Sequence, residues 1–360
     1  MEEQSIKLLL HGIDSLYCAY YCQPFRPNGI NFRHLTEQKE SIRQTKRKNP
    51  LPVILGNTEF FLQPYGTSSG YPLVIENGDF RIEMGEFNKP NFYVKYLSQA
   101  LWRESAFLLH EKFLQWIFSI GYVQYHKENI SRVDFSFDYC IPLIDFNEDY
   151  FVSYSSKDCK HRENRKMQTI TLGKGDIVLR VYDKVAEIKQ KSDKVWFYLL
   201  WKQDKNVWRI EWQVRKNELK KFAIVTFDDL KNNQGNLLFY LASEHDTLRV
   251  PSDDSNHSRW LLHPLWIDLQ QKIEELNQLS ISRINGKQSI LDERLARMSI
   301  SIYGYLKRIG AIECIQGNHS MIDVNEVLKD LGTYINHIHE PLIWKIDVER
   351  KIKEMQLGAW

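Results

Sequence analysis

The chain has 360 residues, a length that fits about two domains, and 43% of them are apolar, so we expect a sizeable packed core. No run of about 18 apolar residues occurs and the first residues are polar and acidic, so neither a membrane-spanning helix nor a signal peptide is expected. A net charge of only +2, from 48 basic and 46 acidic residues, excludes the strongly basic nucleic-acid binders, and any such function must rest on local patches.

The N-terminal third predicts strands and helices in alternation. Residues 6–21 predict a strand, a turn at Gly12-Ile13-Asp14-Ser15 and the start of a helix. Residues 37–48 are rich in Lys and Arg and predict a solvated helix or loop. Short β-type runs with turn residues between them follow, which is typical of antiparallel hairpins. Across residues 97–120 the apolar positions recur at helical spacing and predict an amphipathic helix.

Three later segments, residues 131–139, 177–184 and 208–215, alternate between apolar and polar residues. Such alternation predicts strands that turn one face to a core and the other away from it. The apolar face holds Val133, Phe135 and Phe137; Ile177, Leu179 and Val181; and Trp208, Ile210, Trp212 and Val214. The opposite face holds Arg132, Asp134, Ser136 and Asp138; Arg180, Tyr182 and Lys184; and Arg209, Glu211, Gln213 and Arg215.

The sequence becomes helical in pattern after residue 235. Helical spacing covers residues 261–279, 292–309 and 323–335, and residues 251–256 look like an exposed loop. We therefore expect an α+β fold, with an antiparallel sheet and packed helices in residues 1–250 and a mainly helical region in residues 251–360.

A triplet of Arg, then Ile or Val, then an acid occurs at Arg81, Arg132 and Arg209. The repetition is consistent with an internal duplication or with chance.

Pairing of the three strands in one sheet would bring Asp134, Asp138 and Glu211 together beside Tyr182. Carboxylates that face one another need a cation or raised pKa values, and their hard oxygens suit Mg²⁺ or Mn²⁺. Such a cation polarises a phosphate, and a tyrosine hydroxyl in its field is a competent nucleophile. The residues suited to neutralising the flanking phosphates are Arg132, Arg180, Lys184 and Arg209.

A structural interpretation competes with this one. Acids and arginines on a sheet face commonly form cross-strand ion pairs, and a tyrosine on a strand is usually a packing residue.

The segments RVDFSFDY (132–139), LRVYDKVAEI (179–188) and WRIEWQVRKNELKKF (208–222), in this order, resemble the replication initiation factor family. That family includes rolling-circle plasmid initiators of the Rep_trans type and MobT-type relaxases of integrative elements. The resemblance covers roughly residues 6–270, including residues 12–16 and 93–102. It departs from the family at residues 172–176 (LGKGD), where a Gly-Ser-rich turn is usual.

The resemblance implies metal-dependent nicking of one DNA strand at an origin, by an attack that leaves a phosphotyrosine and a free 3′ hydroxyl. By this resemblance Tyr182 matches the nicking tyrosine, and Asp134 and Glu211 match acidic ligands of Mg²⁺ or Mn²⁺. Asp138 and Glu187 are further candidates for the same site. The residues predicted to contact DNA are Arg132, Arg180, Lys184, Arg209 and Arg215.

The expected partners are origin DNA, as a hairpin or a single-stranded nick site, a host helicase and a second copy in a homodimer, with no membrane. Two alternatives stay open: a non-catalytic DNA-binding regulator on the same fold, and a structural interaction protein. The geometry at Tyr182 distinguishes these alternatives from a nicking enzyme. A nicking site should hold the Tyr182 hydroxyl in an open groove within about 8 Å of Asp134 and Glu211.

Two further features have weaker interpretations. The basic run 157–166 is either solvated or guides a single strand to the site. His337-Ile338-His339 matches the metal-binding pair of another class of nickase, but its helical context near the C-terminus argues against that role.

The five cysteines favour reduced thiols in a cytoplasm, since their number is odd and no secretion signal is expected. Cys18 and Cys22 lack a second pair at zinc-finger spacing, so no zinc site is expected.

Overall fold

The computed structural model describes residues 6–26, 29–45, 48–155, 158–163, 166–192, 194–278, 287–317 and 323–356. Contacts divide the chain into two compact units, Met1–Glu293 and Arg294–Trp360. The first unit therefore extends past residue 250, the boundary predicted from the sequence. The reason is that helix α8 (Pro264–Gln278) buries Leu265, Trp266, Leu269 and Ile273 in the core of that unit.

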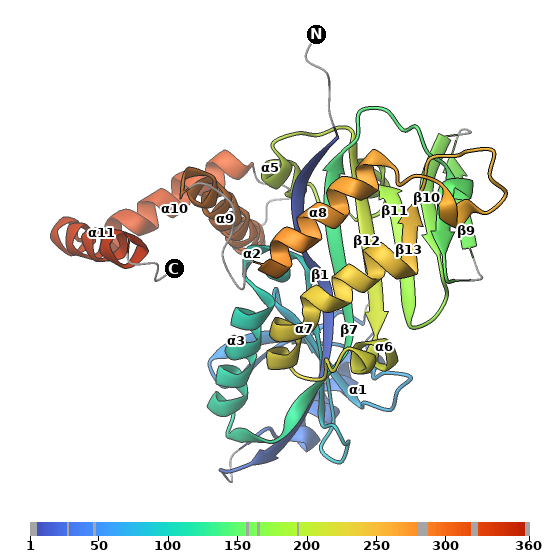
Figure 1. The fold of residues 1–360 in the computed structure, drawn as a ribbon. Helices are drawn as coiled ribbons and strands as arrows, with labels where there is room; N and C mark the ends of the chain where they lie inside the picture. Colours follow the sequence, from blue (N-terminus) through green and yellow to red (C-terminus); the bar gives the residue numbers. More distant parts are fainter. Residues whose placement is uncertain are drawn as a thin grey trace. The chain divides into compact units, whose positions relative to one another are not determined.

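The first unit is built on an antiparallel sheet of 11 strands. Figure 1 shows the part of it that runs from β1 across to β9. Its strand order is β2-β3-β4-β5-β6-β1-β7-β12-β11-β10-β9. The strands are β1 (Lys7–Pro24), β2 (Leu51–Leu55), β3 (Thr58–Leu62), β4 (Leu73–Glu76), β5 (Phe80–Met84), β6 (Phe92–Tyr96), β7 (Tyr122–Cys140), β9 (Asp158–Glu163), β10 (Lys166–Leu172), β11 (Ile177–Asp183) and β12 (Val207–Arg215). A separate pair joins β8 (Phe151–Ser153) to β13 (Asp246–Leu248).

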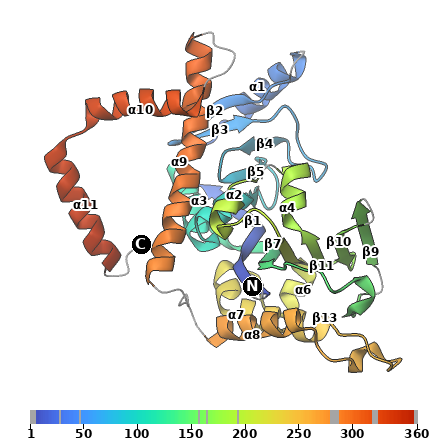
Figure 2. The same ribbon diagram turned by 90° about the horizontal axis from the view of Figure 1, so that it is seen from above.

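The apolar face of the sheet carries the main core. Tyr20 on β1 packs against Phe113 of α3 (Ala106–Ser119), and Trp212 on β12 lies against Trp266 of α8. Helix α7 (Phe227–Tyr240) closes this layer, and its start is fixed by a capping box between Thr226 and Asp229. Figure 2 shows α7 and α8 together on one side of the sheet, with α4 (Lys184–Glu187) on the other.

Short helices follow the strands on the polar side. They are α2 (Ser98–Arg103), α4, a π-helical turn η2 (Ile188–Ser192) and α5 (Phe197–Trp201). Together they carry a second, smaller apolar cluster of Trp102, Val185, Ile188, Phe197, Trp201 and Val207. This cluster covers part of the polar face and so decides which charged side chains stay accessible.

The two halves of the sheet repeat one topology. In each half a long central strand, β1 or β7, is followed by a meander whose last strand, β6 or β12, returns to pair with it. The Arg triplets do not mark this repeat, because Arg81, Arg132 and Arg209 lie on β5, β7 and β12, which are not equivalent strands.

The strand predicted at the start of residues 6–21 is confirmed, but the turn and the helix predicted after it are wrong, since β1 runs unbroken from Lys7 to Pro24. Its register with β7 shifts between Ile13 and Ser15, so Asp14 lies in a bulge of a continuous strand. Gly12 serves packing rather than a turn, because a Cβ there would lie 3.0 Å from the ring of Trp102. The glycine therefore allows the indole to approach the sheet.

The fold class is α+β, as predicted. The helix predicted over residues 97–120 is present as α2 and α3, which meet at Glu104 and Ser105. Residues 37–48 fall partly on α1 (Phe32–Gln44). The remaining helices are α6 (Lys216–Lys221), α9 (Lys287–Gly317), α10 (Val324–Ile338) and α11 (Pro341–Gln356), with short turns η1 (Glu148–Tyr150), η3 (Leu241–His245) and η4 (His257–Arg259). Among the helices described, none has the length and apolar character needed to cross a bilayer.

Candidate functional site

The register of three neighbouring strands places the predicted residues side by side. On β11, β12 and β7 the polar positions share one face, as the alternation predicts. Across the strands the partners are Tyr182, Arg209 and Asp138 in one row; Arg180, Glu211 and Ser136 in the next; then Gln213 with Asp134, and Arg215 with Arg132.

Asp138 and Arg209 form a closed ion pair at one end of this face. The Nε and Nη2 atoms of Arg209 donate to the two Asp138 oxygens at 2.6 and 2.9 Å, and Nη1 donates to Asp14 at 2.8 Å. Arg209 and Asp138 are both 0% exposed. Both acids of this cluster thus bind one buried guanidinium.

Aromatic side chains seal the closed pair. Trp201 of α5 donates its indole N–H to Asp138 at 2.9 Å, and Trp102 of α2 donates to Asp14 at 2.7 Å. The Arg209 guanidinium also lies 4.6 Å from the ring of Phe197. Burial works against the charge of Asp14, yet Arg209 and then Lys194 hold the pKa of Asp14 well below its usual range. The cluster therefore fastens α2 and α5 to the sheet.

Tyr182 and Glu211 form a second cluster beside the first. Tyr182 lies opposite Arg209, and Glu211 lies two residues further along β12. The Tyr182 hydroxyl donates to Glu211 Oε2 at 2.9 Å. Arg180 donates to the other Glu211 oxygen and to Gln213, both at 3.2 Å. Burial, and next the negative charge of Glu211, raises the pKa of Tyr182 well above its usual range. The hydroxyl therefore stays protonated and keeps a carboxylate as its hydrogen-bond acceptor.

Asp134 lies beside this pair and is held by Arg132. The Nε atom of Arg132 donates to one Asp134 oxygen at 2.7 Å, and Nη2 donates to the other. Burial raises the pKa of Asp134 to about 6, although the Arg132 hydrogen bonds lower it, and the nearby Glu211 raises it further. The site thus holds two interacting carboxylates whose charges are only partly compensated.

The site is less open than predicted. We expected the Tyr182 hydroxyl in an open groove, but the side chain is 9% exposed and Lys184 lies above it, with Nζ 5.5 Å from the ring centre. Tyr182 nevertheless belongs to neither apolar cluster of the described residues. The arginines form the accessible rim, since the side chains of Arg180 and Arg132 are 32% and 24% exposed and Arg215 is exposed.

Lys184 is not on the rim. It is buried and donates to Glu187 at 2.6 Å, and Glu187 also accepts from Ser192 at 3.1 Å. Burial, and then the charge of Arg209, lowers the pKa of Lys184. Of the residues predicted to contact DNA, the described structure thus exposes Arg132, Arg180 and Arg215 but encloses Lys184 and Arg209.

Comparison with solved structures finds a rolling circle replication initiator protein from Geobacillus stearothermophilus. The two chains are 17% identical, with a TM-score of 0.43, over 75% of this chain and 97% of that chain. No family model and no curated protein matches the sequence.

The acidic residues do not fit a metal ion in the arrangement described. Among the described residues no three His, Cys, Asp or Glu side chains gather as a ligand set. Asp134 is occupied by Arg132, Glu211 by Tyr182 and Arg180, and Asp138 by Arg209. A cation would have to displace an arginine from at least one of these acids, so Mg²⁺ or Mn²⁺ remains a prediction from the sequence.

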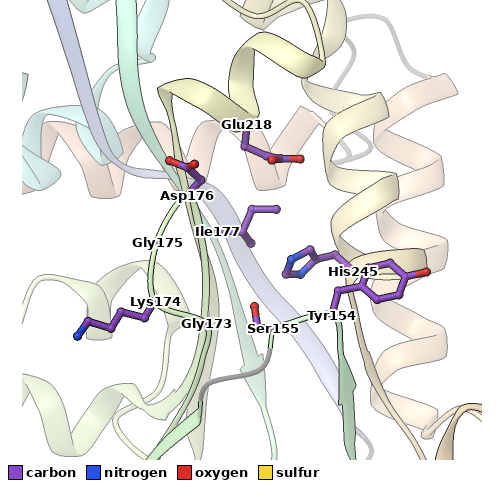
Figure 3. A pocket seen from close by; sticks show the side chains of 9 residues that line it. All are labelled: Tyr154, Ser155, Gly173, Lys174, Gly175, Asp176, Ile177, Glu218 and His245. Carbon is purple, nitrogen blue, oxygen red and sulfur yellow. The ribbon is translucent and has the colours of Figure 1, made fainter.

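A shallow cavity lies at the other end of β11, away from Tyr182 (Figure 3). The turn from Gly173 to Asp176, where the sequence departs from the family pattern, forms one wall, and His245 and Glu218 form another. Ile177 begins β11 and Tyr182 lies near its end, so this cavity is not part of the tyrosine cluster.

Two further sequence candidates are His337 and the basic run 157–166. His337 is exposed on α10, where its Nδ1 lies 2.7 Å from the Thr333 carbonyl oxygen. The side chains of the basic run 157–166 lie outside the described residues. Sequence reasoning missed Asp14, Trp102 and Trp201, because none of them lies in the three alternating segments.

Proposed function

We propose that this protein nicks one strand of DNA, with Tyr182 as the nucleophile and Glu211 as its general base. The observation that carries the proposal is the hydrogen bond from the Tyr182 hydroxyl to Glu211 at 2.9 Å. A tyrosine with a raised pKa attacks only if a base takes its proton, and a carboxylate in hydrogen-bond contact meets that requirement. The motifs shared with the replication initiation factor family support the same assignment.

The reaction is a transesterification. As the Tyr182 hydroxyl proton passes to Glu211, the Tyr182 oxygen bonds to the phosphorus, and the bond from phosphorus to the 3′ oxygen breaks. The 3′ oxygen leaves and takes a proton from solvent, while the 5′ phosphate stays on the tyrosine. Arg180 and Arg132, on the accessible rim, suit the negative charge of the phosphate in transit.

DNA entry requires one local movement. Lys184 lies over the Tyr182 ring and forms an ion pair with Glu187, three residues away in the same short helix. A phosphate that enters between Arg180 and Tyr182 offers Lys184 an alternative anion, so we propose that the lysine turns from Glu187 toward the DNA.

The test is a trapped adduct. Wild-type protein incubated with a single-stranded oligonucleotide carrying the nick site should form a covalent product that mass spectrometry assigns to Tyr182. Tyr182→Phe removes only the hydroxyl and should bind the same DNA without forming an adduct. Tyr198→Phe is the matched control, because the Tyr198 hydroxyl lacks a hydrogen-bond partner in the described structure. An adduct that persists in Tyr182→Phe would sink the assignment.

Metal dependence is tested separately. The same assay run with Mg²⁺, with Mn²⁺ and with a chelator reports whether a cation is needed, whatever the nucleophile. Glu211→Gln and Asp134→Asn then show which acid sets the metal concentration for half-maximal activity.

The burial of Tyr182 favours a second candidate function, a DNA-binding regulator on the same fold. In that case the rim of Arg132, Arg180 and Arg215 binds DNA and Tyr182 is structural. Absence of any adduct with the wild-type protein on its origin, together with tight DNA binding, would select this function. A host helicase as partner remains a prediction from the resemblance.

A further inference from the structure

One row of side chains crosses the polar face of the sheet beside the Tyr182 cluster. It takes one residue from each of five neighbouring strands, β5, β6, β1, β7 and β12, and each residue lies opposite the next: Arg81, Lys95, Tyr17, Arg132 and Arg215. We call it the basic row. Neighbouring strands are about 4.8 Å apart, so the row is roughly 19 Å long. Arg132 also binds Asp134 of the Tyr182 cluster, and Glu76 on β4, opposite Arg81, ends the row at its other side.

The basic row places like charges directly opposite each other twice. Arg81 on β5 faces Lys95 on β6, and Arg132 on β7 faces Arg215 on β12. Cross-strand ion pairs place an acid opposite a base, whereas like charges in facing positions destabilise the pairing of two strands. A polyanion that lies along the row would compensate both repulsions.

The acids beside the basic row are more buried than its cations. The Nζ atom of Lys95 lies 2.6 Å from a Glu83 oxygen, Arg132 donates to Asp134 at 2.7 Å, and both carboxylate side chains are 4% exposed. The side chains of Arg81, Lys95 and Arg132 are 25%, 28% and 24% exposed. At Arg81 and Arg132, the recurring triplet of Arg, apolar residue and acid thus sets an accessible arginine two residues before a sheltered acid. Solvent therefore meets mainly the cations of this row.

Aromatic rings alternate with the cations. The Nζ atom of Lys95 lies 5.4 Å from the ring centre of Tyr17, and the Arg132 guanidinium lies 4.9 Å from it. At the far end, Arg81 lies 5.6 Å from the ring centre of Tyr65, which is 47% exposed. Such alternation is typical of surfaces that hold single-stranded nucleic acid, because cations meet phosphates while unpaired bases stack on rings and on arginine planes. Duplex DNA keeps its base faces stacked internally and would use the cations alone.

We propose that the basic row is a track for single-stranded DNA, which holds the unpaired strand beside the nick and leads it to Tyr182. Its cations bind successive phosphates, and Tyr17 stacks a base. The proposal rests on the nicking function proposed above and deepens it, because it gives the N-terminal half of the sheet a share in binding the substrate.

The charge of the track is tested without nicking, by fluorescence anisotropy of a labelled oligothymidylate, which carries no origin sequence. The full chain should bind it with an affinity that falls as salt rises. Lys95→Gln and Arg81→Gln should each weaken binding roughly threefold or more and reduce the salt slope by about 0.7, the value for one phosphate contact of a single strand. Lys272→Gln is the matched control and should change neither, because Lys272 also pairs with an acid but lies on α8, on the opposite side of the sheet (Figure 2).

Tyr17 separates stacking from charge. Tyr17→Leu removes the ring and should weaken oligothymidylate binding by about 5- to 100-fold with little change in the salt slope, because stacking releases no counterions. Tyr17→Phe keeps the ring and should bind like wild type. Thermal unfolding followed by circular dichroism shows which variants are folded, and the salt slopes of Lys95→Gln and Arg81→Gln decide the question if Tyr17→Leu is not.

Three results would overturn the track. They are a wild type that does not bind oligothymidylate, folded row variants that keep the wild-type affinity and salt slope, and a wild type that binds a blunt duplex more tightly than the single strand. The last result would assign the row to duplex DNA. Failure of the nicking proposal looks different, since no Tyr182 adduct would then form on origin DNA while oligothymidylate binding still depended on the row.

Discussion

Two charged clusters lie on the same face of the sheet and differ in what covers them. The sealed cluster consists of Asp14, Asp138 and Arg209, and the open cluster consists of Tyr182, Glu211, Asp134, Arg132 and Arg180. In both, an arginine on the polar face of a strand is bound to a carboxylate on that face: Arg209 to Asp138, and Arg132 to Asp134. Trp102, Phe197 and Trp201 seal the first pair, whereas the second ends in arginines that solvent reaches. Strand alternation therefore identifies which side chains share a face, but the covering helices decide which of them can meet a ligand.

The two clusters also differ in how fully their charges are paired. In the sealed cluster each of the two carboxylates accepts hydrogen bonds from Arg209 and from an indole N–H, which is how buried ions are held in folded proteins. In the open cluster burial, and then the negative charge of Glu211, raises the pKa of Asp134 to about 6. Charges held at such an energetic cost are typical of functional sites.

The largest expected effect is on catalysis at the open cluster. Glu211→Gln keeps the shape of the side chain but removes the proton acceptor of Tyr182, so adduct formation in a single turnover should slow by about 10²- to 10⁴-fold. Glu218→Gln is the matched control, because Glu218 on α6 is a buried carboxylate that pairs with Lys221 rather than with Tyr182, and this variant should react at close to the wild-type rate. Equal losses in the two variants would mean that Glu211 has no special role.

The next effect is on stability at the sealed cluster. Asp138→Ala leaves the guanidinium of Arg209 buried with only Asp14 as its counter-ion, so the free energy of unfolding should fall by about 3–5 kcal/mol. Asp134→Ala, at the partly open cluster, should cost clearly less, because solvent reaches the Arg132 that it releases. Urea titrations of both variants measure the difference, and similar losses would contradict the contrast between the clusters.

The pH dependence of stability gives a third measurement. The pKa of Asp134 is raised, by burial and then by the Glu211 charge, from 3.8 to about 6 in the folded chain. The folded state therefore binds more protons than the unfolded state between about pH 4 and 6, and this stabilisation, at most about 3 kcal/mol, is lost as the pH rises through that window. Asp134→Asn should remove this decline in the free energy of unfolding. If the variant shows the same pH profile as wild type from pH 4 to 8, Asp134 is not the source of the decline.

Much of the open cluster is predictable from local pattern. Period-two alternation alone puts Tyr182, Glu211, Asp134 and Asp138 on one face, and the register brings Glu211 to Tyr182. Asp138, predicted to join them, is instead bound by Arg209. The antiparallel sheet, the α+β class and most C-terminal helices follow from the same kind of pattern. Helix α11 was not predicted from its spacing.

The sealed cluster could not be predicted because its cover comes from elsewhere in the chain. Arg209 and Arg132 begin the same motif, and nothing local distinguishes the buried arginine from the accessible one. Asp14 looks like part of a turn after Gly12, whereas the glycine admits the Trp102 ring to the sheet. Long-range packing of this kind leaves no periodic signal in the sequence.

The smallest predicted effect isolates one hydrogen bond of the sealed cluster. Trp201→Phe should keep an aromatic ring on Phe197, whose ring centre lies 5.0 Å away, and remove the N–H that donates to Asp138 at 2.9 Å together with part of the indole ring. Asp138 retains both bonds from Arg209, so the free energy of unfolding should fall by only about 1–2 kcal/mol and the adduct rate should not change. In the Asp138→Ala background the same substitution should cost less still, because the acceptor is gone; a double-mutant cycle by urea titration measures that coupling. A coupling near zero would show that the indole acts through packing alone, and a slower adduct rate would show that the sealed cluster also positions the open one.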